Sequence, residues 1–246
     1  MDILSVGNSF SEDAQRYLHM ISKAGGVELN TFNLFIGGCS LEQHYRNMLG
    51  DKREYNLEMN GQRTGFKVSL KEALLNRSWD IVTIQQVSNE SPYYETYQPY
   101  LNKLAEYIRA CVPQSKLIIH QTWAYEQDSY RLNTELGYKS HRDMFSDIEC
   151  SYQRAAREVN ADFIIPSGEL FELLIDNGIE KVHRDTFHAS LGLGRYALGL
   201  LWYAFLTGNE VGNNSFFDFD EEISRNDIAI VRKCVEKIRK NTEIEE

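Results

Sequence analysis

Two short polar loops, one near each end of the chain, carry residue types that together could perform nucleophilic catalysis. The first is Gly7–Ser11, in which Ser9 follows a glycine and an apolar run. The second contains Asp185 and His188, just before a helical pattern. A serine hydroxyl becomes a good nucleophile when an imidazole takes its proton and a carboxylate fixes the tautomer of that imidazole. Ser9, His188 and Asp185 are therefore candidates for a Ser-His-Asp triad.

Each loop also has a plainer interpretation when it is considered alone. Ser9-x-x-Glu12 is a capping-box pattern that would only start a helix. In the second loop, His183, Asp185 and His188 could be three ligands of a metal ion. No further cluster of histidine or cysteine is evident in the sequence, and a metal site would leave Ser9 unused. The serine interpretation therefore accounts for more of these residues, and we expect no metal.

The elements that must position these loops follow from the alternation of apolar runs and helical patterns. Four runs have the composition of buried parallel strands: Ile3–Val6, Ile81–Ile84, Leu117–Ile119 and Phe163–Ile165. Thr31–Phe35 alternates enough to be a further strand, nearer an edge. Helical patterns cover Glu12–Ala24, Tyr97–Cys111, His141–Val159, Leu191–Leu206 and Ile228–Ile238. The alternation predicts an α/β fold with a doubly wound parallel sheet, whose chemistry lies beyond the carboxyl ends of the strands.

One insertion interrupts this alternation. Tyr55–Met59 is followed by Asn60-Gly61 and then by a second polar-apolar strand that ends at Val68. An Asn-Gly pair between two such runs is the favoured turn of a β-hairpin, so we predict a hairpin insertion near residues 53–68. We find no internal repeat, linker or low-complexity tract, and we expect a single domain over residues 1–246.

The composition narrows the choice of partners. The formal net charge of −10 disfavours nucleic acid, whose phosphates such a surface would repel, and it disfavours anionic membranes. No run of eighteen or more apolar residues predicts a membrane span. The four cysteines are far apart, which is typical of a reducing compartment. We therefore expect a cytoplasmic protein, or a secreted one if a leader has been removed from the chain; the oligomeric state stays open.

Together, the two loops resemble the SGNH/GDSL hydrolase superfamily. Gly7–Phe10 is similar to its first block, with Asn8 in place of the usual Asp, and Asp185–His188 matches its last block, Asp-x-x-His. Gly37–Ser40 resembles the second block, in which Gly38 would be the oxyanion glycine. The chain looks most like a bacterial branch of this superfamily whose first block is Gly-Asn-Ser-Phe-Ser. The resemblance implies a three-layer, flavodoxin-like sheet, ester hydrolysis and no cofactor.

The third block departs from the family pattern. The usual Gly-x-Asn-Asp is absent, and the predicted strand ends in Gln85–Ser91. Alignment on the start of the strand makes Asn89 the side-chain donor of the oxyanion hole, whereas the glutamine of some carbohydrate-esterase relatives favours Gln86. Either amide could donate an N–H group to a tetrahedral intermediate. Both amides could also do no more than satisfy loop backbone groups.

Aromatic residues on the later loops bear on the substrate. Trp123 follows a predicted strand on the functional side, and we expect it near the substrate. Tyr93, Tyr94, Tyr97 and Tyr125 lie on nearby loops, where aromatic rings suit sugar faces and acyl chains or form a lid or core edge. By resemblance, the substrate is a small-molecule or carbohydrate ester, first of all an O-acetylated carbohydrate. The alternatives are a thioesterase or transacylase with the same triad, and a non-catalytic carbohydrate-binding relative.

Overall fold

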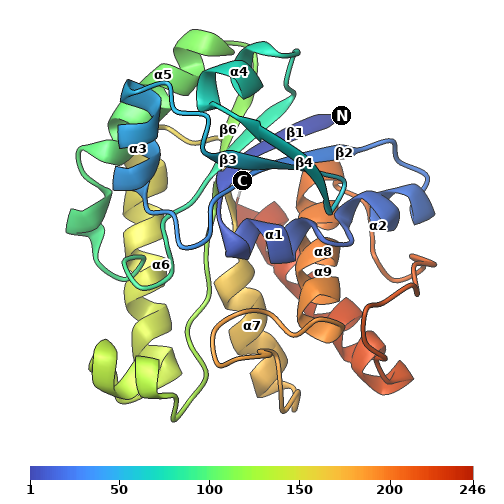
Figure 1. Ribbon diagram of the computed structural model, residues 1–246. Helices are drawn as coiled ribbons and strands as arrows, with labels where there is room; N and C mark the ends of the chain where they lie inside the picture. The colour runs from blue at the N-terminus through green and yellow to red at the C-terminus, as the bar shows by residue number, and fades with distance from the viewer. Residues whose placement is uncertain (246) are drawn as a thin grey trace.

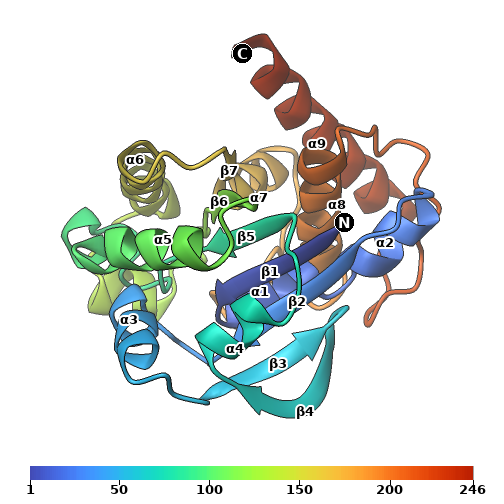
Figure 2. The same ribbon diagram turned by 90° about the horizontal axis from the view of Figure 1, so that it is seen from above.

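A mixed, mostly parallel sheet runs through the molecule and organises everything else. The computed structural model describes residues 1–245, and in this part of the chain the seven strands have the order β4-β3-β2-β1-β5-β6-β7. The parallel strands are β1 (Asp2–Gly7), β2 (Asn30–Phe35), β5 (Ile81–Ile84), β6 (Lys116–His120) and β7 (Ile164–Ile165). Helices cover both faces of the sheet (Figures 1 and 2), so the predicted three-layer α/β fold is confirmed.

The central strands are buried because both faces of the sheet are covered. Ile3, Leu4 and Val6 of β1 are fully buried, and every residue of β5 is buried. Such strands carry nearly continuous Ile, Leu and Val, since neither face meets water. Polar residues such as Asn8, Gln85 and Gln121 directly follow these strands, so the candidate loops lie together at the carboxyl edge of the sheet.

The predicted hairpin is present and has a structural consequence for its neighbour. β3 (Tyr55–Met59) and β4 (Gln62–Val68) are antiparallel, and β3 pairs with β2 in the same sheet. The turn residues Asn60 and Gly61 have φ angles of +51° and +74°, the left-handed values that an Asn-Gly turn provides. β2 was expected nearer an edge, but the hairpin extends the sheet beyond it and makes β2 an internal strand.

The helices form two layers. One face is covered by α3 (Leu41–Leu49), α4 (Leu70–Leu75), α5 (Tyr100–Cys111) and α6 (His141–Glu158). The other face is covered by α1 (Ser9–Gln15), α2 (Leu18–Ala24) and α8 (Leu193–Thr207), with α7 (Ser167–Asp176) and α9 (Arg225–Glu245) packed against α8. Two short helical turns also occur, η1 (Tyr94–Tyr97) and η2 (Arg131–Glu135). In residues 1–245, no helix combines the length and the apolar character that crossing a membrane would require.

Three buried histidines are expected to make the stability of the fold depend on pH. Burial lowers the pKa of His44 and of His120 to about 3, and that of His183 to about 4. In the unfolded chain these groups titrate near 6.5, so below that pH the unfolded state binds more protons than the folded state. We expect the free energy of unfolding to decrease as the pH falls from about 6.5 towards 4, by up to about 1.4 kcal/mol per pH unit for each histidine.

Urea unfolding at pH 7, 6 and 5 measures this dependence. A His44→Asn variant keeps a donor or acceptor near the position of Nδ1, which contacts the Tyr55 hydroxyl at 3.0 Å, but it removes the titration. Its free energy of unfolding should change less steeply with pH than that of the wild type. Equal slopes for the two proteins would contradict the prediction.

Candidate active site

The structure brings Ser9, His188 and Asp185 into one hydrogen-bonded series. Ser9 is the first residue of α1, directly beyond the end of β1, and the other two residues lie in the loop between α7 and α8 (Figure 1). His188 Nε2 is 2.8 Å from Ser9 Oγ, and His188 Nδ1 is 2.8 Å from Asp185 Oδ2. The backbone N–H of His188 donates to Asp185 Oδ1 at 2.9 Å. With a proton on Nδ1 shared with the carboxylate, Nε2 is left to accept the Ser9 proton.

The carboxylate of this series is partly open to solvent. The side chain of Asp185 is 47% exposed and that of His188 is 18% exposed. Burial acts to raise the pKa of Asp185, but hydrogen bonds from the side chain and backbone of His188 outweigh it, and the pKa lies below its ordinary value. Asp185 is therefore ionised at neutral pH, which is the state in which a carboxylate can stabilise an imidazolium.

The start of α1 leaves the Ser9 hydroxyl available for His188. The helix is capped by Asn8, whose Oδ1 accepts from the N–H of Phe10 at 3.0 Å, while the N–H of Asn8 donates to Ser11 Oγ. The capping box is formed by Asn8 and Ser11, so the alternative in which Ser9 caps the helix is wrong. A Cβ atom on Gly7 would lie 2.0 Å from Ser11 Oγ, so a larger residue at this position would displace the Ser11 hydroxyl from the cap.

A buried ion cluster, the Asp13 clamp, fixes the second loop against α1. It consists of Asp13, which is fully buried, with Arg184 and Arg195. Arg184 Nη1 donates to both carboxylate oxygens at 2.9 Å, Arg195 Nε donates at 2.8 Å, and the N–H of Ala189 donates at 3.1 Å. Burial raises the pKa of Asp13, and the two guanidinium groups act against that rise. No local pattern in the sequence predicts this clamp, although Arg184 directly precedes Asp185.

Trp123 supports the site from inside the protein. Its side chain is 0% exposed, so the prediction that it contacts substrate is wrong. The indole N–H donates to the carbonyl of Phe187 at 2.8 Å, and the ring stacks on Phe10 with centroids 4.2 Å apart. Phe10 follows Ser9 and Phe187 precedes His188, so Trp123 contacts the sequence neighbours of both Ser9 and His188.

The loop between Asp185 and His188 holds one residue in an unfavourable backbone conformation. Thr186 has a φ angle of +74°, which a β-branched residue rarely adopts. Its carbonyl accepts from the N–H of Glu126 at 2.7 Å. Such a conformation persists only where the surroundings over-determine it, and here the Asp13 clamp, Trp123 and Glu126 all hold the loop.

The two amides proposed for the oxyanion hole have different surroundings. Gln86 is fully buried; its Oε1 accepts from the N–H groups of Leu41 and Val87, and its Nε2 donates to the carbonyl and hydroxyl of Thr96. The prediction of Gln86 as an oxyanion donor is therefore wrong, because its donors are already used. Asn89 lies exposed on the turn after β5 and is left as the side-chain candidate.

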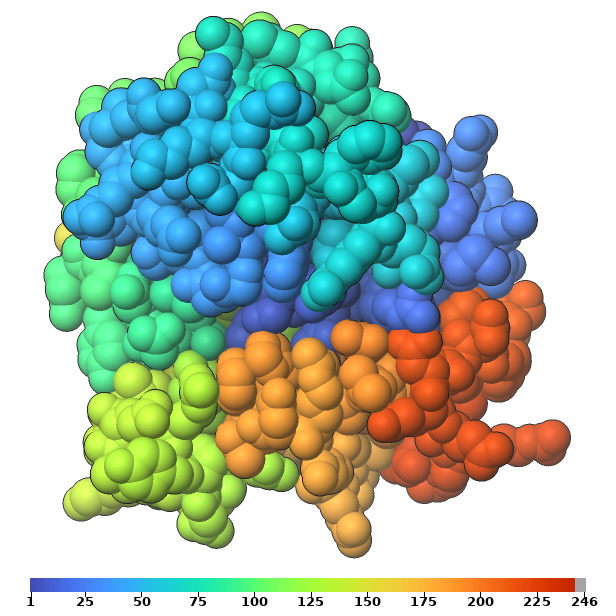
Figure 3. All heavy atoms as spheres, in the orientation of Figure 1, coloured from blue at the N-terminus to red at the C-terminus, as the bar shows by residue number. Residues whose placement is uncertain are grey.

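Gly38 lies exposed on the turn after β2. Its φ angle is +64°, and a Cβ atom on it would meet no atom within 4 Å, so its backbone borders open space. Asn8 Nδ2 donates to the carbonyl of the next residue, Cys39, at 3.1 Å and so joins this turn to the start of α1. In Figure 3 the dark-blue start of the chain lies at the bottom of a furrow, between the orange segment near residues 180–195 and the blue segment near residues 35–50.

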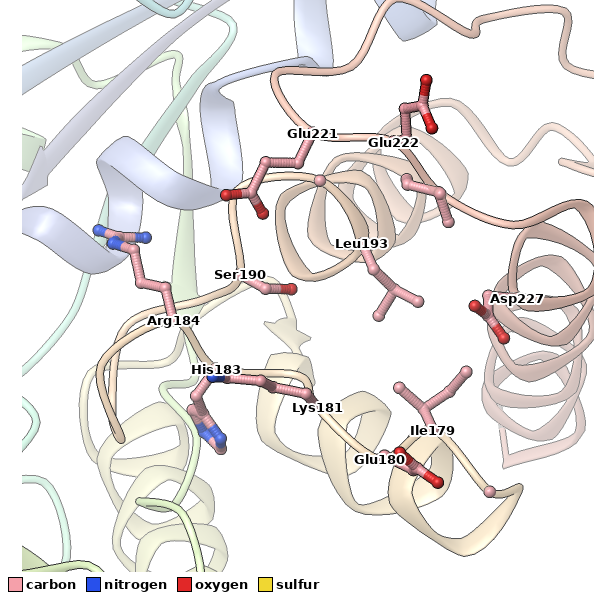
Figure 4. Close-up of a pocket in the computed structure, with 13 residues that line it drawn as sticks. Ile179, Glu180, Lys181, His183, Arg184, Ser190, Leu193, Glu221, Glu222 and Asp227 are labelled. Atoms are coloured by element: carbon pink, nitrogen blue, oxygen red, sulfur yellow. The ribbon is translucent and has the colours of Figure 1, made fainter.

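A second hollow is bordered by Arg184 and Ser190 of the loop between α7 and α8 (Figure 4). It has a volume of about 570 Å³, and Arg184, Glu221 and Asp227 are among the residues around it. Neither Ser9 nor His188 lines it. His183 also borders this hollow, but its Nε2 contacts the carbonyl of Ala124 at 3.0 Å. Within residues 1–245, no group of three His, Cys, Asp or Glu side chains is arranged to hold a metal ion, so the alternative of His183, Asp185 and His188 as ligands is wrong.

The sequence matches a protein family, and the structure is similar to solved structures. The model of the family described as Domain of unknown function (DUF4886) matches residues 2–236. The crystal structure of a DUF4886 family protein from Bacteroides uniformis is 30% identical, with a TM-score of 0.90, and the match covers 96% of this chain and 93% of that one. Among curated proteins, none matches the sequence.

More distant structures share the architecture. A protein from Slackia heliotrinireducens, proposed to be an SGNH hydrolase, is 23% identical with a TM-score of 0.62 over 84% of this chain and 98% of that one. Axe2, an acetylxylan esterase from Geobacillus stearothermophilus, is 15% identical with a TM-score of 0.54 over 86% and 94% of the two chains. These likenesses show the fold of the SGNH hydrolases. On the match over residues 2–236, the chain belongs to the DUF4886 family.

Proposed function

We propose that this protein is a serine esterase that hydrolyses a short-chain acyl ester through Ser9, His188 and Asp185. The observation that carries the proposal is the hydrogen-bonded series, in which both side-chain distances to His188 are 2.8 Å. A nucleophile, a base and an orienting carboxylate within hydrogen-bond reach are the geometric signature of nucleophilic catalysis. The fold shared with an acetylxylan esterase supports the same conclusion.

The reaction follows from the positions of the groups. His188 Nε2 accepts the proton of Ser9 as Oγ attacks the ester carbonyl, and the carboxylate of Asp185 stabilises the imidazolium that forms. The N–H groups of Ser9 and Gly38, together with the amide of Asn89, would bind the oxyanion of the tetrahedral intermediate. His188 then protonates the leaving alcohol. Water, activated by the same imidazole, releases the acyl group from Ser9.

The substrate that we propose is an O-acetylated carbohydrate. Tyr97, Trp123 and Tyr125 are at most 1% exposed, so these aromatic side chains lie in the core and offer a surface neither to an acyl chain nor to a sugar. Asp185 at the open edge of the site is half exposed, so a polar, hydrated substrate suits this face better than a long acyl chain. The acetylxylan esterase with the same fold acts on an ester of this class.

Hydrolysis of p-nitrophenyl esters by the purified protein tests the proposal. We expect kcat/KM for the acetate to exceed that for the decanoate at least about tenfold, because an open polar site gives the long chain no apolar surface to bury. A fluorophosphonate should abolish the activity and leave one adduct, which peptide mass mapping places on Ser9. A chelator should have no effect. Activity that chelator removes, or an adduct on another serine, would overturn the proposal, and faster turnover of acetyl thioesters would favour the thioesterase alternative.

A further inference from the structure

A series of buried hydrogen bonds, which we call the relay and which joins His120, Gln85, Asn8 and Cys39, crosses the carboxyl edge of the sheet beside Ser9. His120 ends β6, Gln85 follows β5, Asn8 follows β1 and Cys39 lies beyond β2, and these four strands are neighbours in the sheet (Figure 2). His120 Nδ1 is 2.6 Å from Gln85 Oε1, and Gln85 Nε2 donates to Asn8 Oδ1 at 2.7 Å. Asn8 Nδ2 donates to the carbonyl of Cys39 at 3.1 Å. All four residues are at most 3% exposed.

Fixed backbone groups set the donor and the acceptor of every hydrogen bond in this series. Asn8 must face Phe10 with its oxygen, since the N–H of Phe10 donates to it, and must face the carbonyl of Cys39 with its nitrogen. Gln85 must therefore present its nitrogen to Asn8 and its oxygen to His120. The proton of neutral His120 must then lie on Nδ1. Reversal of one amide would set two donors or two acceptors against each other in a buried place, which is costly.

His120 is suited to this role by its surroundings. Burial lowers its pKa to about 3, so the ring is neutral at physiological pH and carries a single N–H. Its Nε2 is buried and has no hydrogen-bond partner in the part of the chain that the structure describes. The ring packs edge-on against Trp202 with centroids 4.8 Å apart. Within the described residues, the hydrogen bond from Nδ1 to Gln85 is therefore the one hydrogen bond of the His120 ring.

We propose that Gln85 and His120 are positioning residues that act through Asn8 to hold the oxyanion-binding backbone of the esterase. This inference rests on the function proposed above. The two backbone donors lie beyond the ends of different strands, β1 and β2: Ser9 follows Asn8, and Gly38 precedes Cys39. The side chain of Asn8 is the link between them, and Gln85 and His120 fix its orientation.

Asn8 itself explains why the link needs an amide. The carboxylate of the aspartate usual at this position would place an oxygen against the carbonyl of Cys39, where Asn8 places a donor. Gln85 then supplies the matching donor to Asn8 Oδ1. Oxyanion donors act at 2.7–3.1 Å in general, so a small displacement of either turn should weaken the stabilisation of the transition state more than the binding of the substrate.

Substitution of His120 separates this role from simple filling of the core. Asparagine places an N–H close to the position of Nδ1, whereas leucine fills the space with no donor. We expect His120→Leu to lower kcat for p-nitrophenyl acetate about 10- to 100-fold with KM within about twofold, because only the transition state loses stabilisation. His120→Asn should retain kcat within about threefold on the same argument.

Two outcomes would overturn the relay in this test. A folded His120→Leu protein with wild-type kcat is one, and a loss in His120→Asn as large as that in His120→Leu is the other. Circular dichroism at the assay temperature shows whether each variant is folded. If His120→Leu does not fold, Gln85→Met, which has similar length and no amide, should show the same selective loss of kcat, and an unchanged kcat there overturns the relay.

A measurement without turnover distinguishes failure of the relay from failure of the proposed function. Long-range ¹⁵N–¹H correlation spectra of the wild-type protein at pH 7 report which nitrogen of His120 carries the proton, with His120→Asn used to assign the signal. We expect the Nδ1–H tautomer. The Nε2–H tautomer would overturn the relay even in an active enzyme, whereas a wild-type protein that hydrolyses no ester would overturn the proposed function.

Discussion

Replacing Ser9 with alanine should lower kcat for p-nitrophenyl acetate by about 10⁴- to 10⁶-fold, because the nucleophile of the proposed reaction is removed and only oxyanion and substrate binding remain. Ser9 Oγ is 2.8 Å from the imidazole that would deprotonate it. The variant should remain folded, because Asn8 caps α1 and the Ser9 hydroxyl takes no part in that cap. Its thermal midpoint should therefore lie close to that of the wild type.

Ser78→Ala is a matched control for this experiment. Ser78 is exposed and lies before the first residue of β5, which is the opposite end of that strand from the proposed site. Its variant should hydrolyse the ester at the wild-type rate. A Ser9→Ala protein that keeps more than about 1% of the wild-type kcat would contradict the proposed nucleophile, since residual catalysis by binding alone is far weaker.

The strands and the hairpin could be predicted because their patterns depend on local sequence. The run Ile81–Ile84 coincides with β5, and the Asn-Gly turn is found where the hairpin required it. Short helices were harder to predict. The chain forms α4 over six residues and α3 over nine, too few turns to establish a clear period. The predicted helix Glu12–Ala24 is instead two helices, which meet at Arg16 and Tyr17.

The side chains of the site differ in how far their positions follow from sequence. Ser9, Asp185 and His188 are candidates from their residue types and loop positions, and the resemblance of both loops to the SGNH/GDSL blocks joins them into one predicted site. The roles of Gln85 and Gln86 could not be assigned, because adjacent residues at a strand end point to opposite sides. Gln86 turns towards Thr96, and Gln85 turns towards Asn8. The surrounding packing decides which glutamine contacts Asn8 and which contacts Thr96.

The Asp13 clamp is the part of the site least visible in the sequence. Its arginines lie 171 and 182 positions from Asp13, and no local pattern connects residues so far apart. Because its residues lie so far apart in the sequence, the clamp can join segments that the backbone does not hold together. Asp13 is one helical turn from Ser9, and Arg184 adjoins Asp185, so one ion cluster holds together two segments from opposite ends of the chain.

Replacing Asp13 with alanine should lower the free energy of unfolding by about 3–5 kcal/mol, because the change leaves two guanidinium groups without their buried carboxylate. Arg184 and Arg195 both donate to Asp13, as does the backbone of Ala189, and Asp13 is 0% exposed. Urea unfolding followed by circular dichroism measures the loss. If the alanine variant does not fold, Asp13→Asn keeps an acceptor for one arginine and should show a smaller loss in the same direction.

Asp220→Ala is the informative comparison, because Asp220 shares an arginine with Asp13 but not its burial. Asp220 pairs with Arg195 at 3.0 Å and also with Arg16, yet its side chain is 27% exposed. Water can replace a lost partner at such a position, so this variant should lose no more than about 1 kcal/mol. A loss at Asp13 as small as that at Asp220 would show that the arginines find other partners. The larger loss at Asp13 would show that burial, rather than the number of ion pairs, fixes the loop of Asp185 and His188 against the helix of Ser9.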